Sequence, residues 1–183
     1  MDSRALHNVH VLIVDRKVGN AKLLRDMLLS LGLAGVEVAE DTACALDVLR
    51  SADFDAIFCD EAVGPLDVFG FAVAVRRRRG LRNPVIPIVM ISDGPQRAQV
   101  ERARDAGVND LLVRPLSTNA VSRKLLALLT APKLFVQTQA FCGPNRRRER
   151  AAAGAGKDAA TSSGARHAGK FSRRRTDRAA PKA

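Results

Sequence analysis

Residues 54–67 read FDAIFCDEAVGPLD, and the apolar run Ala56–Cys59 within them ends directly at the carboxylate of Asp60. The run is continuous, whereas a strand with one solvent-exposed face would alternate apolar and polar residues. A continuous run of this length is typical of a parallel strand that is buried on both faces of its sheet. The stretch therefore predicts a central strand that delivers a carboxylate to the end of a parallel sheet.

Further apolar runs of the same kind lie on both sides of this stretch, at Val9–Val14, Ile88–Ile91 and Leu111–Val113, with a weaker one at Val36–Ala39. Helical patterns lie between and after them, at residues 23–31, Thr42–Arg50, Phe69–Arg79, Gln96–Ala106 and Thr118–Leu129. Gly32, Gly80 and Gly107 follow three of these patterns and act as stop signals. Strands that alternate with helices in this way predict a parallel sheet with right-handed crossovers and helices on both faces.

The charge of the chain is distributed unevenly. Of the net formal charge of +11, residues 1–130 carry +1 (17 Lys and Arg, 16 Asp and Glu) and residues 131–183 carry +10 (13 and 3). Residues 143–183 contain one large apolar side chain, Phe171. Such a segment cannot bury enough apolar surface to offset the entropy lost on ordering. We therefore predict a folded domain over residues 8–130 and a basic, mostly disordered tail over residues 131–183.

Cysteine usage and hydropathy indicate the cellular compartment. The three cysteines, Cys44, Cys59 and Cys142, have neither the spacing of a metal site nor that of a redox motif, which fits a reducing environment. The N-terminus has no apolar signal-peptide core, and no run approaches the roughly 18 apolar residues of a spanning helix. We expect a cytoplasmic protein without membrane insertion.

Polar residues follow the main apolar runs at the points where the strands are predicted to end. These residues are Asp15, Asp60, Ser92 and Arg114. In an open parallel sheet, function collects beyond the carboxyl ends of the strands. Two carboxylates, a hydroxyl and a cation should therefore meet at one edge, although any one of them alone would be an ordinary turn residue.

At these residues the chain resembles the response-regulator receiver domain, in particular chemotaxis-type single-domain receivers with an arginine-rich C-terminal extension. The matching segments are VLIVD at 11–15, FDAIFCDEAVGPLD at 54–67, IPIVMIS at 86–92 and AGVNDLLVRP at 106–115. The resemblance implies an α/β flavodoxin-like fold, doubly wound, with five parallel strands in the order 2-1-3-4-5. It also implies a non-enzymatic, stand-alone response regulator of two-component signalling that acts by protein–protein interaction.

The resemblance also assigns roles to the residues at the strand ends. Asp60 is implied to be the phosphoacceptor, and Mg²⁺ is implied to bind Asp15, Asp60 and the backbone of Ala62. Three positions respond to the phosphate in such a domain, namely Ser92 as the switch hydroxyl, Arg114 as the phosphate-contacting cation and Leu111 at the switch position. The implied partners are a sensor histidine kinase or phosphotransfer protein and an output protein, and Pro115 is implied to follow a cis peptide bond.

Three residues depart from the family pattern. Arg16 stands where a second acid usually follows the first strand, so the implied metal site loses one negative charge and gains a positive one. Arg114 replaces the usual Lys and presents a forked set of donors. Leu111 replaces the usual aromatic residue. These departures make Mg²⁺ binding and metal-dependent phosphorylation an open question.

Arginines cluster at the end of one predicted helix. Arg76–Arg79 close the third helical pattern just before Gly80. Cations at this position complement the negative end of the helix dipole. We interpret the run as a solvated helix terminus.

The tail contains two similar arginine-rich units, FCGPNRRRER at 141–150 and FSRRRTDR at 171–178. Arg makes bidentate contacts to phosphates and to the edge of guanine, and a neighbouring Phe could stack on a base. The first unit resembles a GPDRRR-type extension that in one group of receivers binds cyclic di-GMP and acts at the flagellar motor. The candidate ligand-binding residues are Arg146, Arg147, Arg148, Arg150, Arg173, Arg174, Arg175 and Arg178.

Three functions of the whole chain stay open at this point. The first is a phosphoswitch with Asp60 as its input site. The second is a degenerate receiver scaffold whose tail binds cyclic di-GMP. The third is a tail that contacts proteins or any polyanion, such as nucleic acid; DNA binding is the weakest form of it because no recognition helix is visible in the sequence.

Overall fold

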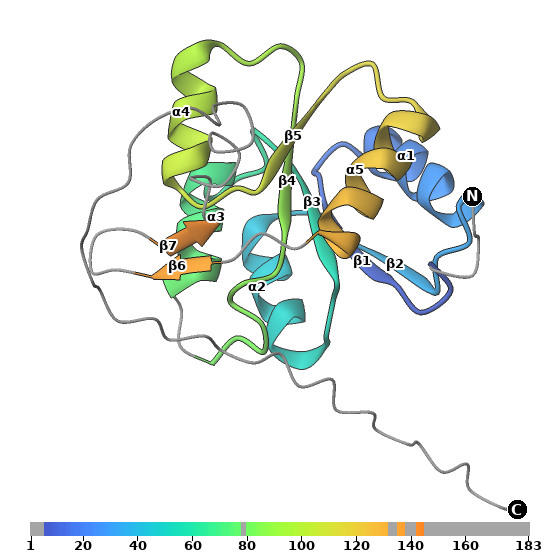
Figure 1. Ribbon diagram of the computed structural model, residues 1–183, viewed down its shortest axis with the longest axis horizontal. Helices are drawn as coiled ribbons and strands as arrows, with labels where there is room; N and C mark the ends of the chain where they lie inside the picture. The colour runs from blue at the N-terminus through green and yellow to red at the C-terminus, as the bar shows by residue number, and fades with distance from the viewer. Residues whose placement is uncertain (1–5, 78–79, 132–134, 138–141, 145–183) are drawn as a thin grey trace, which may run out of the picture.

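The computed structural model describes residues 6–77, 80–131, 135–137 and 142–144, shown as ribbons in Figure 1. Five parallel strands form one sheet in the order β2-β1-β3-β4-β5, which confirms the predicted topology. The strands are β1 (His10–Val14), β2 (Gly35–Ala39), β3 (Ala56–Asp60), β4 (Ile88–Ser92) and β5 (Asp110–Val113). The helices are α1 (Val18–Ser30), α2 (Thr42–Ser51), α3 (Val68–Arg77), α4 (Arg97–Asp105) and α5 (Thr118–Thr130).

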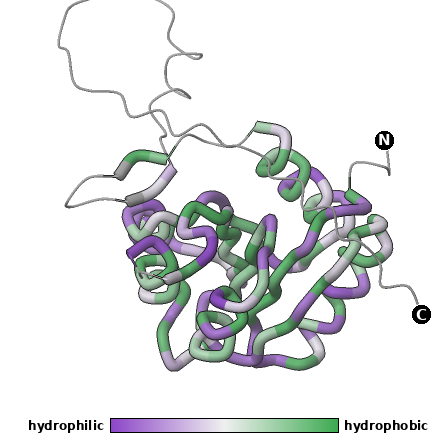
Figure 2. Tube along the Cα trace, turned by 90° about the horizontal axis from the view of Figure 1, so that it is seen from below, coloured by the Kyte–Doolittle hydropathy of each residue, from purple (hydrophilic) through white to green (hydrophobic). Residues whose placement is uncertain are grey.

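Two apolar layers cover the two faces of the sheet. One layer joins β-strand residues such as Ile57 and Met90 to α2, α3 and α4, and the other joins Phe58 and Val89 to α1 and α5. Every residue of β3 and β4 is buried, as expected for continuous apolar runs at the centre of a doubly covered sheet. Figure 2 shows hydrophobic segments running through the interior of the trace.

Helix ends are set by residues that the sequence marks. Gly32, two residues after the end of α1, has a φ of 84°, a left-handed conformation that favours glycine. Ser117 caps α5, as its hydroxyl accepts a hydrogen bond from the Ala120 amide at 3.3 Å. Thr42, at the start of α2, is fully buried and donates its hydroxyl to the Gly64 carbonyl. This contact ties α2 to the loop that follows Asp60.

The apolar stripe of α1 is only partly buried. Leu24 and Leu28 face the core, as their spacing predicts. Leu23, from the same stripe, is 54% exposed. It lies near the strand ends and lines the groove described below.

The structure corrects the interpretation of the arginine run after α3 in the case of Arg76. Its side chain is 4% exposed, and its guanidinium donates to the carbonyls of Gly107 and Pro84 and to Asn109 Oδ1 at 2.8–3.2 Å. A charged group is buried here because carbonyl and amide oxygens surround it. Arg76 is therefore a structural part of the core, and the solvated-terminus interpretation is wrong for this residue.

Two short strands follow α5, where the sequence shows no strand pattern. They are β6 (Phe135–Gln137) and β7 (Cys142–Pro144), and they pair antiparallel. Gly143 and Pro144 are buried, and Figure 1 shows the pair beside α3. This small sheet brings the first part of the extension onto the folded domain.

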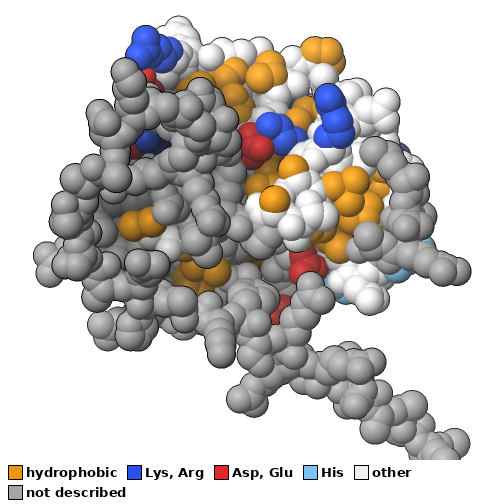
Figure 3. All heavy atoms as spheres, viewed as in Figure 1, with side chains coloured by type: hydrophobic (Ala, Val, Ile, Leu, Met, Phe, Trp, Pro, Cys, Tyr) orange, Lys and Arg blue, Asp and Glu red, His pale blue; other side chains and the backbone are white. Residues whose placement is uncertain are grey.

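The surface seen in Figure 3 carries a mixture of apolar, basic and acidic side chains. This agrees with the near-neutral charge of residues 1–130. Within the described ranges, none of the helices combines the length and the apolar character needed to cross a membrane.

Candidate functional site at the strand ends

The sheet brings the four predicted polar residues to one edge. Asp15 directly follows β1, Asp60 ends β3, Ser92 ends β4 and Arg114 directly follows β5. Asp15 and Asp60 are 4% and 5% exposed, so both carboxylates lie almost entirely out of water. Two buried carboxylates on neighbouring strands repel each other and require a nearby cation.

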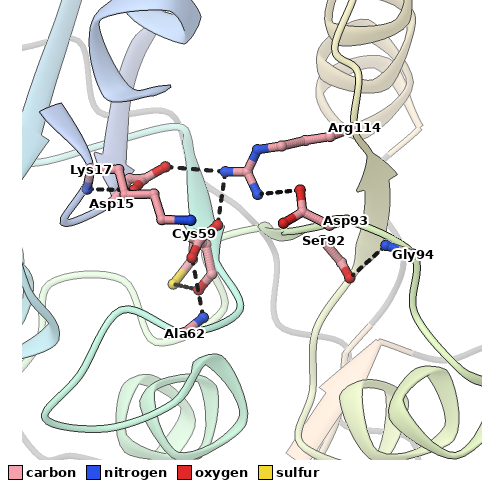
Figure 4. Close-up of polar contacts among 9 residues, drawn as sticks. Asp15, Lys17, Cys59, Ala62, Ser92, Asp93, Gly94 and Arg114 are labelled. Atoms are coloured by element: carbon pink, nitrogen blue, oxygen red, sulfur yellow. Dashed lines mark hydrogen bonds and ion pairs between the residues drawn. The ribbon is translucent and has the colours of Figure 1, made fainter. Parts of the chain in front are cut away.

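Arg114 supplies that cation: its guanidinium contacts both carboxylates, and in Figure 4 it lies between Asp15 on one side and Asp93 on the other. Its Nη2 is 2.8 Å from Asp60 Oδ1 and 3.2 Å from Asp15 Oδ2. Its Nη1 is 3.3 Å from Asp93 Oδ1, so one side chain bridges three acids. The fork of an arginine makes this possible, whereas a single ammonium could not span the same oxygens as well.

Backbone amides hold the remaining carboxylate oxygens. The Lys17 amide donates to Asp15 Oδ1 at 2.8 Å, and the Ala62 amide donates to Asp60 Oδ2 at 3.2 Å. The Lys17 side chain extends toward the same cluster in Figure 4. Each carboxylate therefore has one oxygen facing Arg114 and the other facing the start of the following loop.

The cluster shifts the pKa values of its members. Burial raises the pKa of Asp15, and the charge of Asp60 adds to the rise, while the hydrogen bond from Lys17 and the charge of Arg114 act against it. Burial alone would lower the pKa of Arg114, but its contacts with Asp60, Asp93 and Asp15 outweigh burial and raise it. Arg114 is thus a permanent positive charge at the centre of the site.

Cys59, next to Asp60 on β3, is fully buried. Burial, with the neighbouring carboxylates, raises the pKa of its thiol well above the usual value. It is a core residue, as its apolar surroundings in the sequence indicate.

The other sequence-predicted residues lie around the cluster. Ser92 is buried, and its hydroxyl accepts from the Gly94 amide at 3.3 Å and points away from Asp15 in Figure 4. Leu111, on β5 beside Met90, packs partly buried against the core. The peptide bond between Arg114 and Pro115 is cis, as the resemblance implied, and a second cis bond joins Gly64 to Pro65.

The residues present do not fit a divalent cation well. Such a cation takes carboxylate, carbonyl and water oxygens, and several of these must be free to face it. Here Asp15 and Asp60 both direct one oxygen at Arg114, and Arg16 is exposed. Throughout the described part of the chain, no three acidic, histidine or cysteine side chains converge on a point where a metal ion could bind.

Sequence reasoning missed two members of the cluster, Lys17 and Asp93. Both lie just beyond strand ends: Lys17 is three residues after the end of β1, and Asp93 directly follows Ser92, the last residue of β4. An analysis that extended each strand end by three residues would have included both. The bridging position of Arg114 has no such signal, because side-chain direction depends on packing between distant elements.

An open groove of about 420 Å³ borders Arg114. Its walls come from the start of α1 and from the loops after β4 and β5, and it is lined by Asn20, Leu23, Asp93, Arg114, Pro115 and Leu116. The guanidinium therefore contacts solvent on one side while its other side faces the buried acids. All eight arginines predicted for the tail ligand lie outside the described residues.

Comparisons with known proteins agree with this geometry. Residues 11–126 match the family model of the response regulator receiver domain. The chain is 28% identical over 118 residues to chemotaxis protein CheY-3 of Vibrio cholerae. This alignment covers 64% of this chain and 89% of that protein.

Solved structures show the same fold. One is Vibrio cholerae chemotaxis protein CheY4, with a TM-score of 0.62 and 25% identity, covering 67% of this chain and 99% of that one. Another is the receiver domain of a sensor histidine kinase from Pseudomonas aeruginosa, with a TM-score of 0.61 and 23% identity, covering 68% and 99%. That structure holds a magnesium ion in its active-site cleft.

Proposed function

This chain belongs to the response regulator receiver domain family, and on that premise we propose that Asp60 accepts a phosphoryl group and that the domain signals by binding other proteins. Membership places the chain in two-component signalling. The phosphoryl donor would be a histidine kinase or a phosphotransfer protein, and the output would be a protein partner.

The observation that carries the proposal is the pairing of Asp60 with Arg114 at the edge of the sheet. Asp60 Oδ1 faces the Arg114 guanidinium at 2.8 Å, and that guanidinium also borders an open groove. A donor that reaches Asp60 would therefore bring its phosphoryl group beside a fixed positive charge, because Arg114 contacts both the carboxylate and the groove. Fixed cations of this kind stabilise the charge on a transferring phosphoryl group.

The step itself is a displacement at phosphorus. An oxygen of the Asp60 carboxylate forms the new P–O bond, and the bond between phosphorus and the donor breaks. The donor leaves with the electron pair of that bond and takes up a proton from solvent. The phosphoryl oxygens can then accept from Arg114, which has to give up part of its contact with Asp15 or Asp93.

We propose that Ser92 responds to this change. It ends β4, the strand beside β3, and its hydroxyl is held only by the neighbouring Gly94 amide among the contacts described. A rotation of this hydroxyl toward a phosphoryl group on Asp60 would release Gly94 and alter the loop before α4. Local charge changes of this kind act as switches when they favour one of two packing states.

The proposal is tested by intact-mass measurement after incubation with acetyl phosphate, in parallel with and without Mg²⁺. Wild type and Asp26→Asn, a control on the exposed face of α1, should gain one phosphoryl mass, whereas Asp60→Asn should not. If wild type stays unmodified with acetyl phosphate and with a histidine kinase, Asp60 is not a phosphoacceptor. The fold assignment would be unaffected.

A further inference from the structure

The space between Asp15 and Asp60 already holds a positive charge. Arg114 Nη2 is within 3.2 Å of an oxygen from each carboxylate, and the Arg114 side chain is 19% exposed. A divalent cation that used the same two oxygens would have to move this group away. The first question for cation binding at this site is therefore whether Arg114 can leave.

The two buried contacts of Arg114 make it hard to displace, and a third contact with the exposed Asp93 adds little to them. Nη1 is 3.3 Å from Asp93 Oδ1, on the side away from Asp15 and Asp60. A movement of the guanidinium into the groove would break the two buried ion pairs with Asp15 and Asp60. In return the guanidinium would gain only its hydration by water. Pairs of this kind, once formed out of water, are costly to break because each partner is left uncompensated.

The charge balance of the cluster points the same way. Asp15 and Asp60 contribute two buried negative charges, and Arg114 contributes one positive charge between them. The Lys17 side chain brings a second positive charge toward the cluster (Figure 4). Arg114 and Lys17 thus bring two positive charges against Asp15, Asp60 and the exposed Asp93, so the chain itself offsets most of the negative charge on which the affinity of a hard cation depends.

We propose that Arg114 is a resident counterion, a side chain that occupies the place of a divalent cation and keeps Mg²⁺ out of this site. Arg16 removes a potential ligand, but the exclusion is set by Arg114. The proposal concerns the cation alone and does not depend on phosphorylation of Asp60. Its test accordingly uses no phosphoryl donor.

The experiment titrates the full-length chain with MgCl₂ by isothermal calorimetry, with thermal unfolding followed by circular dichroism in parallel. Arg114→Met removes the charge and keeps an apolar stem, Arg16→Asp supplies the missing acid, and the double variant does both. Arg123→Met, at an exposed position on α5, is the matched control for loss of an arginine.

We expect no saturable Mg²⁺ binding at millimolar concentrations in wild type or Arg123→Met, and little gain in Arg16→Asp. Arg114→Met should bind Mg²⁺ on the order of tenfold more tightly than wild type, and the double variant more tightly still. The proposal is overturned if wild type binds Mg²⁺ saturably, if Arg16→Asp alone restores binding, or if folded Arg114→Met binds no better than wild type.

Arg114→Met leaves two buried acids without their cation, so it could fail to fold. In that case wild type and Arg16→Asp decide the matter, because a ligand that binds only the folded state raises the unfolding temperature. A rise with MgCl₂ in either protein overturns the proposal. An unchanged temperature in both supports it.

Discussion

The guanidinium carbon of Arg76, on α3, lies 4.7 Å from the centre of the Phe135 ring, on β6. The same guanidinium donates to the Gly107 carbonyl and to Asn109 Oδ1, between α4 and β5. Asn109 Oδ1 in turn accepts from the Ile88 amide at the start of β4. One buried cation therefore joins α3, the corner before β5 and the first strand of the extension.

Replacement of Phe135 should loosen the extension from the domain. In Phe135→Ala the cation loses the ring face and β6 loses its apolar contact, so we expect the free energy of unfolding to fall by about 1–2 kcal/mol. Chemical denaturation followed by circular dichroism measures this. Phe135→Leu keeps apolar area without the ring and should lose less. An unchanged free energy in Phe135→Ala would show that the strand pair adds nothing to stability.

Replacement of Arg76 should cost more than replacement of Phe135. Arg76→Met places an apolar side chain among the Gly107 and Pro84 carbonyls, which would then lack a hydrogen-bond donor. We therefore expect the free energy of unfolding to fall by about 3 kcal/mol. Arg97→Met is the control, because Arg97 is exposed and its pair with Glu101 is a surface pair worth less than about 1 kcal/mol. Equal losses in the two variants would contradict the structural role of Arg76.

The fold could be predicted because its signals are local. Continuous apolar runs such as Ala56–Cys59 mark strands buried on both faces, and Gly32 and Ser117 mark helix ends. The gathering of Asp15, Asp60, Ser92 and Arg114 at one edge follows from strand polarity alone. These are properties of the backbone and of the local apolar pattern, which the sequence contains directly.

Other features depend on contacts between distant residues. Arg76 resembles its neighbours in the arginine run, and its burial is decided by oxygens from residues 84, 107 and 109. The strands β6 and β7 have three residues each, too few to produce a periodic pattern. The bridge formed by Arg114 likewise needs the loops after β1, β3 and β4 in place.

The arginine units of the tail provide a prediction that depends on their chemistry alone. If they read guanine, calorimetry should show saturable cyclic di-GMP binding that exceeds cyclic di-AMP binding by about 1–3 kcal/mol per bidentate contact. Replacement of Arg146–Arg148 by lysines keeps the charge and removes the forked donors, so affinity should fall sharply. Equal binding of both dinucleotides, tolerance of lysine and steep weakening by salt would indicate a general polyanion contact instead.

The buried carboxylate of Asp15 should make stability depend on pH in a defined direction. Burial raises the pKa of Asp15 in the folded state, so the folded protein favours the protonated form more than the unfolded chain does. The stability that this group contributes is present below its unfolded pKa, near 3.9, and is lost as pH rises through the higher folded pKa. At neutral pH the charged carboxylate thus lowers stability.

Asp15→Asn should remove this cost. The amide oxygen of the new side chain can still accept the hydrogen bond from the Lys17 amide, and Arg114 keeps its ion pairs with Asp60 and Asp93. We expect the variant to unfold a few degrees higher than wild type at neutral pH, and the difference to shrink as the pH falls toward about 4. Thermal unfolding by circular dichroism over a pH series measures it, with the exposed Asp26→Asn as control. A variant less stable than wild type at neutral pH would mean that the pairing with Arg114 outweighs the burial of Asp15.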